Sequence, residues 1–538
     1  MFIALNKNNL ILGIVVLVAI VVRFLWLGEI PPSLNWDEVS HGYNAYSILK
    51  TSKDEWGNML PIIFRAYGDY KLPVYIYLTA LAELFFGLNY FSVRLISVIA
   101  GIGSVIFTYL LVKRYFQTEK IALYSALLMA VSPWSVFVSR AAFEANLALF
   151  FIIAGAYFFA SKKFITSALL LGLSVLTYNS ARVFVPLLLV STFILYRREI
   201  KLRFWIVVAL FILPMIVQLM NPVGQARYEN LKIINPGVIA YLEEQRNISM
   251  LPDVVTKVLY NKPIYFVGEV VKNYIHHFSP ENLFFQGSTD FQFNVPNHGL
   301  LYWSMLPFFY VGMLIAIKNM HDKKYLYLLT WLFLAPVASS VTQDAPHVLR
   351  SLVMLPIVII LISLAIERTI RRPLALGAII LFMCIQFAVY VQSYAGYRNT
   401  YSWSWQYGHE QAVKYISEHY DEYEAIVMTK KYGEPHEFIL FYGAWEPHAY
   451  HSDRNLYHYE QSNWFWVDRF AKFYFINDWE IPKEGSSFST ERDLQLECAS
   501  ERCLLVTTPT TVPEGWRLVE TIYFLDGMVA FEIYNQSL

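Results

Sequence analysis

Residues 10–27 read LILGIVVLVAIVVRFLWL, and after a short gap residues 35–42 read NWDEVSHG. The first stretch is long and apolar enough to cross a bilayer as a helix. The second places two adjacent carboxylates, Asp37 and Glu38, where the chain leaves the lipid. Carboxylates are costly there and tend to mark substrate handling or proton transfer. A solvated pair of loop acids is the competing interpretation, and these two residues alone favour neither. No small-residue cleavage site follows 10–27, so we expect a retained helix.

The composition is that of a membrane protein. Of the 538 residues, 56% are hydrophobic and 16% are charged, whereas about a quarter of a soluble domain is charged. The net charge of zero argues against a nucleic-acid partner. We expect a mainly α, polytopic membrane fold with about 11 transmembrane helices. The expected spans are 10–27, 91–112, 121–138, 145–160, 164–178, 183–196, 203–220, 298–317, 325–340, 348–366 and 373–391.

Basic residues predict the orientation of these spans. One set of alternate loops carries 15 Lys and Arg residues, in 113–120, 162–163, 197–203, 318–324 and 368–372. The short loops on the other side carry three, Arg140, Arg182 and Arg350. Because cytoplasmic loops are enriched in Lys and Arg, the first set is predicted to be cytoplasmic.

Asp37 is predicted on the outer face and the basic loop at 113–120 in the cytoplasm, so only one crossing can lie between them. Because 91–112 is that crossing, we predict that 72–88 does not cross the bilayer. We predict that it is a helix at the outer interface, inside a long first outer loop at 28–90. A second long outer loop is expected at 221–297. The division predicted is a transmembrane catalytic domain at 1–391 and a soluble extracytoplasmic α/β domain at 392–538.

Within the carboxyl-terminal domain, the patterns predict a helix at 409–419 and strands at 424–429, 502–508 and 517–534. Cys498 and Cys503 lie close together there, and a local disulfide and two free thiols both remain open. Cys384 lies in an apolar run and is expected in the core.

Charged residues of both signs are predicted on the outer membrane face. The cations are Lys71, Arg140, Arg182 and Arg350, and the acids are Asp37, Glu38 and Glu144. Any single arginine at an interface is explained by snorkelling or helix-end pairing. The collection instead suits a lipid-linked phosphate, bound by the cations, beside a general base or groups that bind sugar hydroxyls. Candidate substrate-binding residues are Trp36, His41, Tyr43, Tyr70, Tyr178 and His347; for most of the aromatic residues, an interfacial belt is the alternative.

Three segments carry a family resemblance. Residues 36–42 (WDEVSHG) resemble the first-loop Asp-Glu motif of protein O-mannosyltransferases, and residues 71–77 (KLPVYIY) are similar to the Lys-Pro-Pro stretch of lipid A aminoarabinose transferases, with Leu72 replacing the first proline. Residues 140–144 resemble the second-loop Arg and acid of both groups. The resemblance covers roughly residues 10–200 and, more loosely, the chain to 391.

This resemblance implies a GT-C glycosyltransferase that uses a polyprenyl-phosphate sugar. It implies Asp37 as the base, Lys71 as a phosphate ligand and Glu144 as the second-loop acid, and transfer with inversion and without a nucleotide. Glu38 or Glu144 is expected to orient the acceptor or bind sugar hydroxyls. The acceptor is a hydroxyl of a protein, lipid or glycan at the outer face of the plasma membrane. No cofactor is required by the sequence, and a divalent metal stays undetermined: His276 and His277 are adjacent and more often ordinary interface residues.

Three other functions remain as alternatives. A transporter or lipid-linked glycan flippase is expected to place ionisable groups near the bilayer midplane on broken, repeated helices. A sensor anchored by its helices does not need acids and cations on one face. A ligase or polymerase with a lipid pyrophosphate donor shares the same electrostatic logic and is the hardest to separate.

Overall fold

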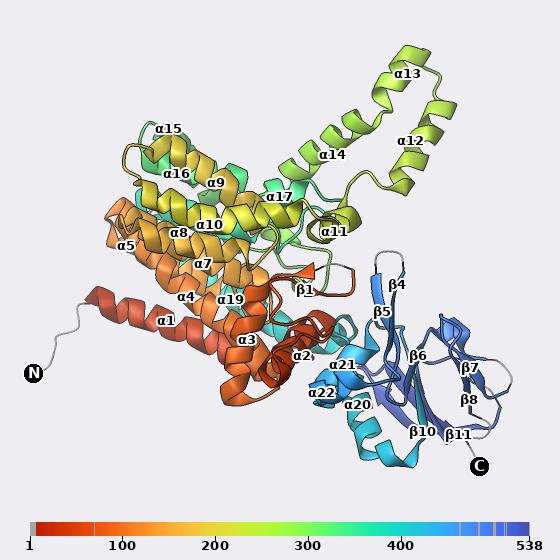
Figure 1. The fold of residues 1–538 in the computed structure, drawn as a ribbon. Coiled ribbons are helices and arrows are strands. Elements are labelled where there is room, and N and C mark those ends of the chain that lie inside the picture. The colour runs from red at the N-terminus through yellow and green to blue at the C-terminus, as the bar shows by residue number, and fades with distance from the viewer. Residues whose placement is uncertain are drawn as a thin grey trace, which may run out of the picture. The chain divides into compact units, whose positions relative to one another are not determined.

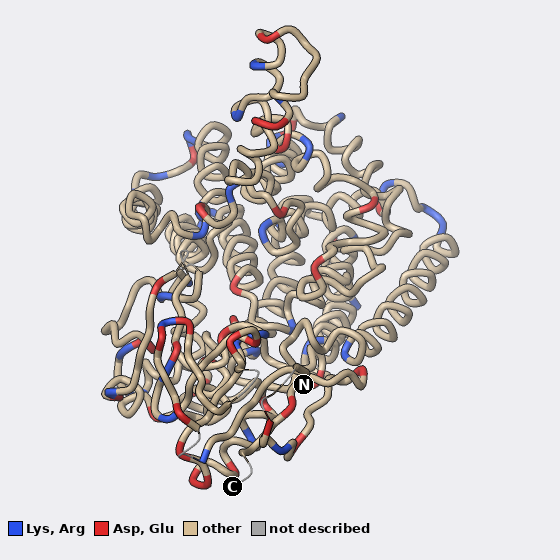
Figure 2. Tube along the Cα trace, turned by 90° about the vertical axis from the view of Figure 1, so that its right-hand side faces the viewer, with Lys and Arg blue, Asp and Glu red and all other residues tan. Residues whose placement is uncertain are grey.

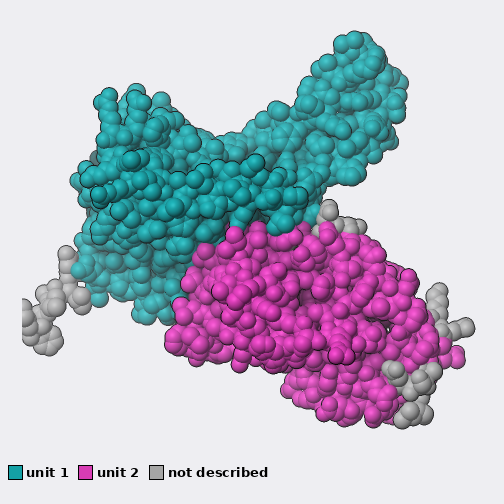
Figure 3. Space-filling view, viewed as in Figure 1, with its two compact units in different colours: residues 1–25, 97–139, 143–391 teal, residues 26–96, 140–142, 392–538 magenta. Residues whose placement is uncertain are grey.

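The computed structural model describes residues 7–68, 70–461, 464–482, 485–498, 502–510, 512 and 514–536. The chain forms two compact units (Figure 3). Unit 1 comprises 1–25, 97–139 and 143–391, and unit 2 comprises 26–96, 140–142 and 392–538. The boundary expected at residue 391 coincides with a boundary between the units. The first outer loop, however, lies in the same unit as the carboxyl-terminal domain.

Unit 1 is helical (Figure 1). Helix α4 (Tyr90–Phe116) enters it from unit 2, and α19 (Pro373–Thr400) leaves it. Its other α-helices are α1 (Lys7–Phe24), α5 (Glu119–Val131), α6 (Pro133–Val138), α7 (Glu144–Ala160), α8 (Phe164–Val175), α9 (Ala181–Tyr196), α10 (Leu202–Leu219), α11 (Pro222–Leu231), α12 (Pro236–Ile248), α13 (Asp253–Leu259), α14 (Lys262–His276), α15 (Leu306–Lys318), α16 (Lys323–Leu334), α17 (Val337–Ser340) and α18 (Leu355–Thr369). Single turns lie at η1 (Glu281–Phe285), η2 (Trp303–Met305) and η3 (Leu352–Met354).

The helices of unit 1 pack as a bundle through their apolar faces. Helix α18 is buried along most of its length and packs against α5 and α15, while α8 packs against α7 and α10. Helices α12 and α13 extend away from the bundle (Figure 1). Charged residues lie mainly at helix ends and in the strand-rich part of the chain, with long uncharged stretches between them (Figure 2).

Every predicted span contains a helix. Among the described residues, five helical segments are long and apolar enough to cross a membrane: Lys7–Phe24, Tyr90–Phe116, Leu202–Leu219, Leu352–Thr369 and Pro373–Thr400. These helices fit multi-pass insertion, and the number of 11 crossings stays a prediction.

Some details of the predicted spans differ from the structure. Two predicted spans start too early, because the helical turns begin at Trp303 and Leu352 and not at 298 and 348. Cys384, predicted in the core, is exposed. An apolar residue of a membrane helix can face lipid, so an apolar run does not by itself indicate burial against protein.

Unit 2 combines the first outer loop with the carboxyl-terminal domain. The loop supplies α2 (Trp36–Thr51), the hairpin of β1 (Phe64–Arg65) and β2 (Tyr70–Lys71), and α3 (Pro73–Phe86). The domain supplies α20 (His409–Glu418), α21 (Pro435–Tyr442), α22 (Pro447–Ser452) and the single turns η4 (Ser402–Trp405), η5 (Tyr420–Glu422) and η6 (Asp478–Glu480). Helix α2 packs against α3, α21 and α22. The helix predicted at 72–88 is present as α3, and its place at the membrane interface stays a prediction.

The carboxyl-terminal domain is built on a mixed seven-stranded sheet. The strands are β3 (Ala425–Thr429), β4 (Tyr457–Gln461), β5 (Trp464–Phe470), β6 (Phe473–Ile476), β9 (Cys503–Thr507), β10 (Trp516–Tyr523) and β11 (Val529–Gln536), in the order β10-β11-β9-β3-β6-β5-β4. Strand β3 pairs in parallel with β6 and β9, and the other pairs are antiparallel. The three parallel strands are buried throughout, which explains their continuous apolar sequences.

The elements predicted in this domain are confirmed, with one refinement. The stretch predicted as a strand at 517–534 is a hairpin of β10 and β11. A small pair of strands, β7 (Ser487–Ser489) and β8 (Gln495–Glu497), lies beside the sheet. Cys498 and Cys503 form a disulfide, with their Cα atoms 5.7 Å apart.

Candidate active site

Glu38 is fixed on all sides at the first turn of α2. Asn35 caps the helix: its side-chain oxygen accepts from the Glu38 N–H at 3.0 Å, and its own N–H donates to Glu38 Oε2 at 3.2 Å. The guanidinium of Arg94 donates to both carboxylate oxygens, at 2.9 and 3.0 Å, and the Ala142 N–H donates to Oε1 at 2.9 Å. Four donors occupy a carboxylate that has about four lone-pair positions. The environment of Glu38 is therefore that of a positioning residue.

Asp37 has the opposite environment. Its side chain is 55% exposed, whereas that of its partner, Lys71, is 6% exposed. Lys71 Nζ lies 2.9 Å from Asp37 Oδ1 and donates to the Asp37 backbone carbonyl at 3.2 Å. It also lies 3.3 Å from Nδ1 of His41. The acid predicted as the base is therefore accessible, and it is held by a buried cation.

Lys71 owes its position to the β1–β2 hairpin, in which it pairs with Phe64. Its ammonium lies 5.2 Å from the ring centre of Tyr67, and the Tyr67 hydroxyl donates to the Trp36 carbonyl at 2.5 Å. The predicted phosphate-binding lysine and the acid motif are thus joined by three kinds of contact: an ion pair, a cation–π contact and a hydrogen bond.

Three aromatic rings gather beside the acid motif. Trp36 lies 5.8 Å from Tyr67 and 6.3 Å from Trp464 of the carboxyl-terminal domain, and Tyr67 stacks on Trp464 at 5.9 Å. The Trp36 N–H donates to Gln406 Oε1 at 2.8 Å. Gly433 approaches Trp36 so closely that a Cβ there would lie 2.2 Å from its ring. The carboxyl-terminal domain therefore helps to shape the surroundings of the acid motif.

Two buried arginines hold the chain segment before α2. Arg94 donates to the carbonyls of three residues in addition to Glu38: Leu27, Pro31 and Ser33. Arg140 donates to the carbonyls of Ile30 and Trp26 and lies over the Tyr394 ring at 5.6 Å. Arg140 is 3% exposed, so these contacts are structural. Its predicted role in binding phosphate stays a prediction.

The other predicted residues of unit 2 differ in exposure. Tyr43 is fully buried and donates to the Trp445 carbonyl at 3.2 Å, as a core residue does. Tyr70 is partly exposed in β2 and lies 6.1 Å from the Phe465 ring. Of the two, Tyr70 is the one a substrate can reach.

Unit 1 holds the remaining predicted residues. Arg182 and Arg350 line one cavity of about 160 Å³, together with Arg227. The rest of its wall is largely apolar, with Val183, Leu219, Leu231, Ala338 and Val341. Such a wall with three guanidinium groups suits an anion on an apolar chain. The sequence did not predict Arg227, because it lies in α11, inside the segment 221–297 that was predicted to be a long loop.

Tyr178, Glu144 and His347 interact with one another or with these arginines. The charges of Arg227, Arg350 and Glu144 all act on the buried Tyr178. His347 Nδ1 accepts from the backbone N–H of Arg350 at 3.4 Å, and burial together with the Arg350 charge holds the His347 pKa well below its usual range. Asp344 forms an ion pair with Arg350.

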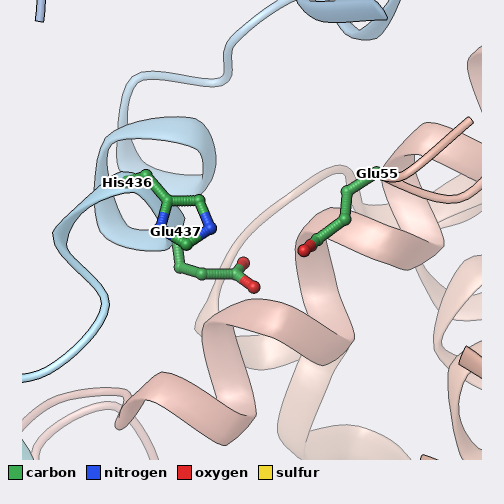
Figure 4. A group of neighbouring side chains, drawn as sticks. All are labelled: Glu55, His436 and Glu437. Carbon is green, nitrogen blue, oxygen red and sulfur yellow. The ribbon is translucent and has the colours of Figure 1, made fainter. Parts of the chain in front are cut away.

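One further cluster lies in unit 2. Among the described residues, Glu55, His436 and Glu437 are the group whose possible metal-ligand atoms all lie within 4.8 Å of one another (Figure 4). Burial raises the pKa of the Glu437 and Glu55 carboxyls and lowers that of His436 to about 3. The sequence did not predict this cluster, because Glu55 lies 381 positions before His436 and the two share no motif. His276 and His277 lie outside it.

Arg94 was also missed, although its sequence carried a signal. It is a single charge near the start of the apolar run at 91–112, and an ionisable residue in such a run is by default a candidate for function.

The model of the dolichyl-phosphate-mannose-protein mannosyltransferase family matches residues 13–220. An uncharacterized protein of Aquifex aeolicus (strain VF5) is 29% identical over 181 residues, which cover 34% of this chain and 42% of that protein.

Two solved structures share the fold. ArnT from Cupriavidus metallidurans bound to undecaprenyl phosphate has a TM-score of 0.55 and 13% identity, and the match covers 98% of both chains. Its apo state has a TM-score of 0.51. The archaeal oligosaccharyltransferase AglB from Archaeoglobus fulgidus, in complex with an inhibitory peptide and a dolichol-phosphate, has a TM-score of 0.51, 15% identity, and a match over 82% of this chain and 64% of that one. The family match over residues 13–220 and the shared fold confirm the predicted resemblance to the GT-C membrane glycosyltransferases, among them the protein mannosyltransferases.

Proposed function

We propose that the protein transfers a sugar, with inversion, from a polyprenyl-phosphate-linked donor to a hydroxyl of a protein, lipid or glycan at the extracytoplasmic face of the plasma membrane. The observation that carries the proposal is the accessible Asp37 carboxylate, 2.9 Å from the buried Lys71 ammonium, inside the segment that matches the mannosyltransferase family. The undecaprenyl phosphate bound by ArnT and the dolichol-phosphate bound by AglB support a donor of this chemical class.

Asp37 is the general base in this reaction. It takes the proton of the acceptor hydroxyl as that oxygen attacks the anomeric carbon and the bond from this carbon to the phosphate oxygen breaks. The leaving group is a phosphate that already carries charge, so no acid has to protonate it. A fixed cation such as Lys71 stabilises the charge that develops there. Glycosidases differ, because they need a second carboxyl as the acid.

The unit 1 cavity supplies a second candidate for donor binding. Its three arginines can pair with a phosphate, while its apolar wall can contact the isoprenoid. Arg182 already donates to Gln218 Oε1 at 2.7 Å and Arg350 to Thr342 Oγ1 at 2.9 Å, so both guanidinium groups are held in place before a ligand binds.

A transfer assay tests the proposal. Full-length protein in lipid nanodiscs is supplied with a panel of radiolabelled polyprenyl-phosphate sugars and with protein, lipid and glycan acceptors. Transfer from one monophosphate donor is the expected result. Transfer from a polyprenyl-pyrophosphate donor alone would identify a ligase or polymerase, and movement of the donor across the bilayer without transfer would identify a flippase.

A further inference from the structure

A large exposed apolar surface of unit 1 lies on the arm at residues 221–276, which contains α11, α12, α13 and α14. Figure 1 shows α12 and α13 away from the bundle, and Figure 3 shows this part of unit 1 as a slender projection. Helices α12, α13 and α14 have 13, 7 and 15 residues and bury one residue each, Leu242, Thr256 and Asn273. Helices this short are marginal in water without a surface to pack against. The arm therefore needs a surface that the described part of the chain does not supply.

The exposed apolar side chains gather on one face of α14 and at the tip of the arm. In α14 they are Ile264, Val267, Val271 and Ile275, and spacings of three and four positions place them on one side of the helix. The tip, formed by α13 and the residues before it, adds Ile248, Met250, Leu251, Val254, Val255, Val258 and Leu259. Exposed apolar residues gathered in this way mark a contact with a protein or a membrane.

The charged side chains of α13 and α14 pair within the arm. Lys257 Nζ lies 2.7 Å from Asp253 Oδ2, and Lys272 Nζ lies 3.2 Å from Glu269 Oε2. A helix with an apolar face and a charged face suits the boundary between lipid and water. Because the charges already have partners, the apolar face and not a charge of one sign selects what the arm binds.

The attachment of the arm indicates which surface it meets. It follows α10, a helix long and apolar enough to cross a membrane. Near its start, the Leu231 carbonyl accepts from the Gln343 N–H at 2.9 Å. Near its end, the Asn273 side chain donates to the carbonyls of Ser340 and Thr342, at 3.3 and 3.2 Å. An arm held where an apolar span ends lies at the depth of the lipid headgroups.

Tyrosines along the arm agree with that depth. The Tyr241 ring of α12 lies 6.3 Å from the Tyr265 ring of α14, and Tyr241 and Tyr228 are exposed. Tyrosine is enriched at both interfaces of a bilayer, because its ring is apolar and its hydroxyl is polar. The partner that combines an apolar interior with a polar boundary is the lipid leaflet itself.

We propose that the apolar faces of α13 and α14 bind the leaflet at this end of the spans, which is the predicted outer leaflet. The apolar side chains enter the boundary between headgroups and acyl chains, while the paired charges stay in water. Binding does not require anionic lipid. Because Thr342 holds the arm and also accepts from Arg350 at 2.9 Å, the arm extends the wall of the arginine cavity onto the lipid surface.

Fluorescence quenching in a bilayer tests this contact. A Cys384→Ser background leaves only the disulfide-bonded Cys498 and Cys503, and single cysteines at Val255 or Lys257 are labelled with bimane. These positions of α13 point about 160° apart. Full-length protein is placed in phosphatidylcholine nanodiscs with and without lipids that carry a spin label on the acyl chain. The Val255→Cys label should emit at shorter wavelength and be quenched by the lipid spin label, whereas iodide in the water should quench the Lys257→Cys label.

Matched variants test both helices. Val271→Cys and Glu269→Cys, two positions apart on α14, should show the same contrast. Val258→Asp should remove the lipid quenching of the Val255→Cys label, because a carboxylate is costly in the apolar part of a bilayer. Lys257→Asp places the same carboxylate on the polar face and should leave that quenching intact.

Equal quenching of Val255→Cys and Lys257→Cys by iodide, with none from lipid spin labels, would overturn the proposal if the protein is folded and monodisperse. A protected Val255→Cys label that lipid spin labels do not reach would overturn it as well. Protection that is lost in nanodiscs with one chain would then identify a second copy as the partner, and protection that needs an added acceptor would identify a docking site for that acceptor. None of these readouts requires sugar transfer, so they are independent of the proposed function.

Discussion

The neighbouring acids Asp37 and Glu38 lie in different environments. The Glu38 carboxylate is saturated by four donors, including the buried Arg94, while Asp37 is half exposed beside Lys71. The helix period explains the difference, because consecutive residues of α2 point about 100° apart, one toward the interior and one away from it. The sequence predicted that both acids matter, but not that only one of them is accessible.

Asp37→Asn should reduce transfer about 10²- to 10⁴-fold, because the amide cannot accept the proton of the attacking hydroxyl. The shape of the side chain is kept, so donor binding should change little. Initial rates and equilibrium binding of the donor, measured on the same preparation, check this. Near-normal transfer by a folded Asp37→Asn protein would remove Asp37 as the base.

Lys71→Ala should damage donor binding and transfer together, since the phosphate loses a charged partner in both the ground state and the transition state. Donor binding is measured with the lipid-linked sugar and the rate with saturating acceptor. Donor affinity equal to that of the wild type would show that Lys71 serves only to hold Asp37.

Glu38→Gln should destabilise the protein by about 3–5 kcal/mol, because Arg94 is left as a buried charge without its carboxylate. The unfolding midpoint measures this loss. Glu29→Gln is the matched control: it breaks the exposed pair of Glu29 and Arg398, which should contribute little. Equal effects of the two variants would contradict the structural role of Glu38.

At the scale of elements, hydrophobic runs and charge patterns were sufficient to locate the helices and the strands of the carboxyl-terminal domain. They were insufficient for contacts between distant elements. Trp464 begins β5 and reaches Trp36 across more than 400 positions, and Arg94 reaches Glu38 from another helix. Periodicity describes which face of an element is apolar, but it does not identify the element that covers that face.

Gly433 allows the carboxyl-terminal domain to approach Trp36. Gly433→Ala introduces strain at a φ of +112° and places a methyl group 2.2 Å from the Trp36 ring. Gly527→Ala is the matched control, since its φ is +90° but nothing lies within 4 Å of the added Cβ. Both variants should lose roughly 1–2 kcal/mol to backbone strain. Only Gly433→Ala should also change the KM for the acceptor or donor in the transfer assay.

His409 of α20 makes stability depend on pH. Burial lowers its pKa to about 4, and its ring stacks on Phe438 at 3.9 Å. Between about 6.5 and 4 the unfolded chain binds a proton that the folded chain does not. The free energy of unfolding is therefore unaffected by His409 above pH 6.5. As the pH falls from 6.5 toward 4, protonation of the unfolded chain lowers that free energy by roughly 3 kcal/mol. His409→Phe should flatten the unfolding midpoint against pH over this range; an unchanged slope would contradict the assignment.

For the whole molecule, the sequence predicted a mainly helical membrane fold, but not how the chain is divided into units. It grouped the first outer loop with the spans because the two are consecutive. The structure groups that loop with residues 392–538, through contacts such as that of Trp36 with Gln406. Asp37 and Lys71 therefore lie in unit 2, while Arg182 and Arg350 lie in unit 1.

The 15 basic residues on one set of loops predict that this set is cytoplasmic and that the tail is outside. In a Cys384→Ser background, His448→Cys should be blocked by a membrane-impermeant thiol reagent in intact cells, because His448 is exposed. Arg198→Cys, in a predicted cytoplasmic loop, should react only after lysis. The opposite pattern would reverse the topology and place Asp37 in the cytoplasm.

The hydrogen bond between Trp36 and Gln406 joins residues 370 positions apart, and this separation has a consequence for biosynthesis. A ribosome adding roughly 5–20 residues per second completes the acid motif at least about 20 s before it makes the residues that cover it. During that interval Gln406, Gly433 and Trp464 do not yet lie around the motif. A nascent chain therefore lacks the contacts that shape the surroundings of the acid motif in the finished protein, and translation that stops before the last quarter of the message yields a chain that never forms them.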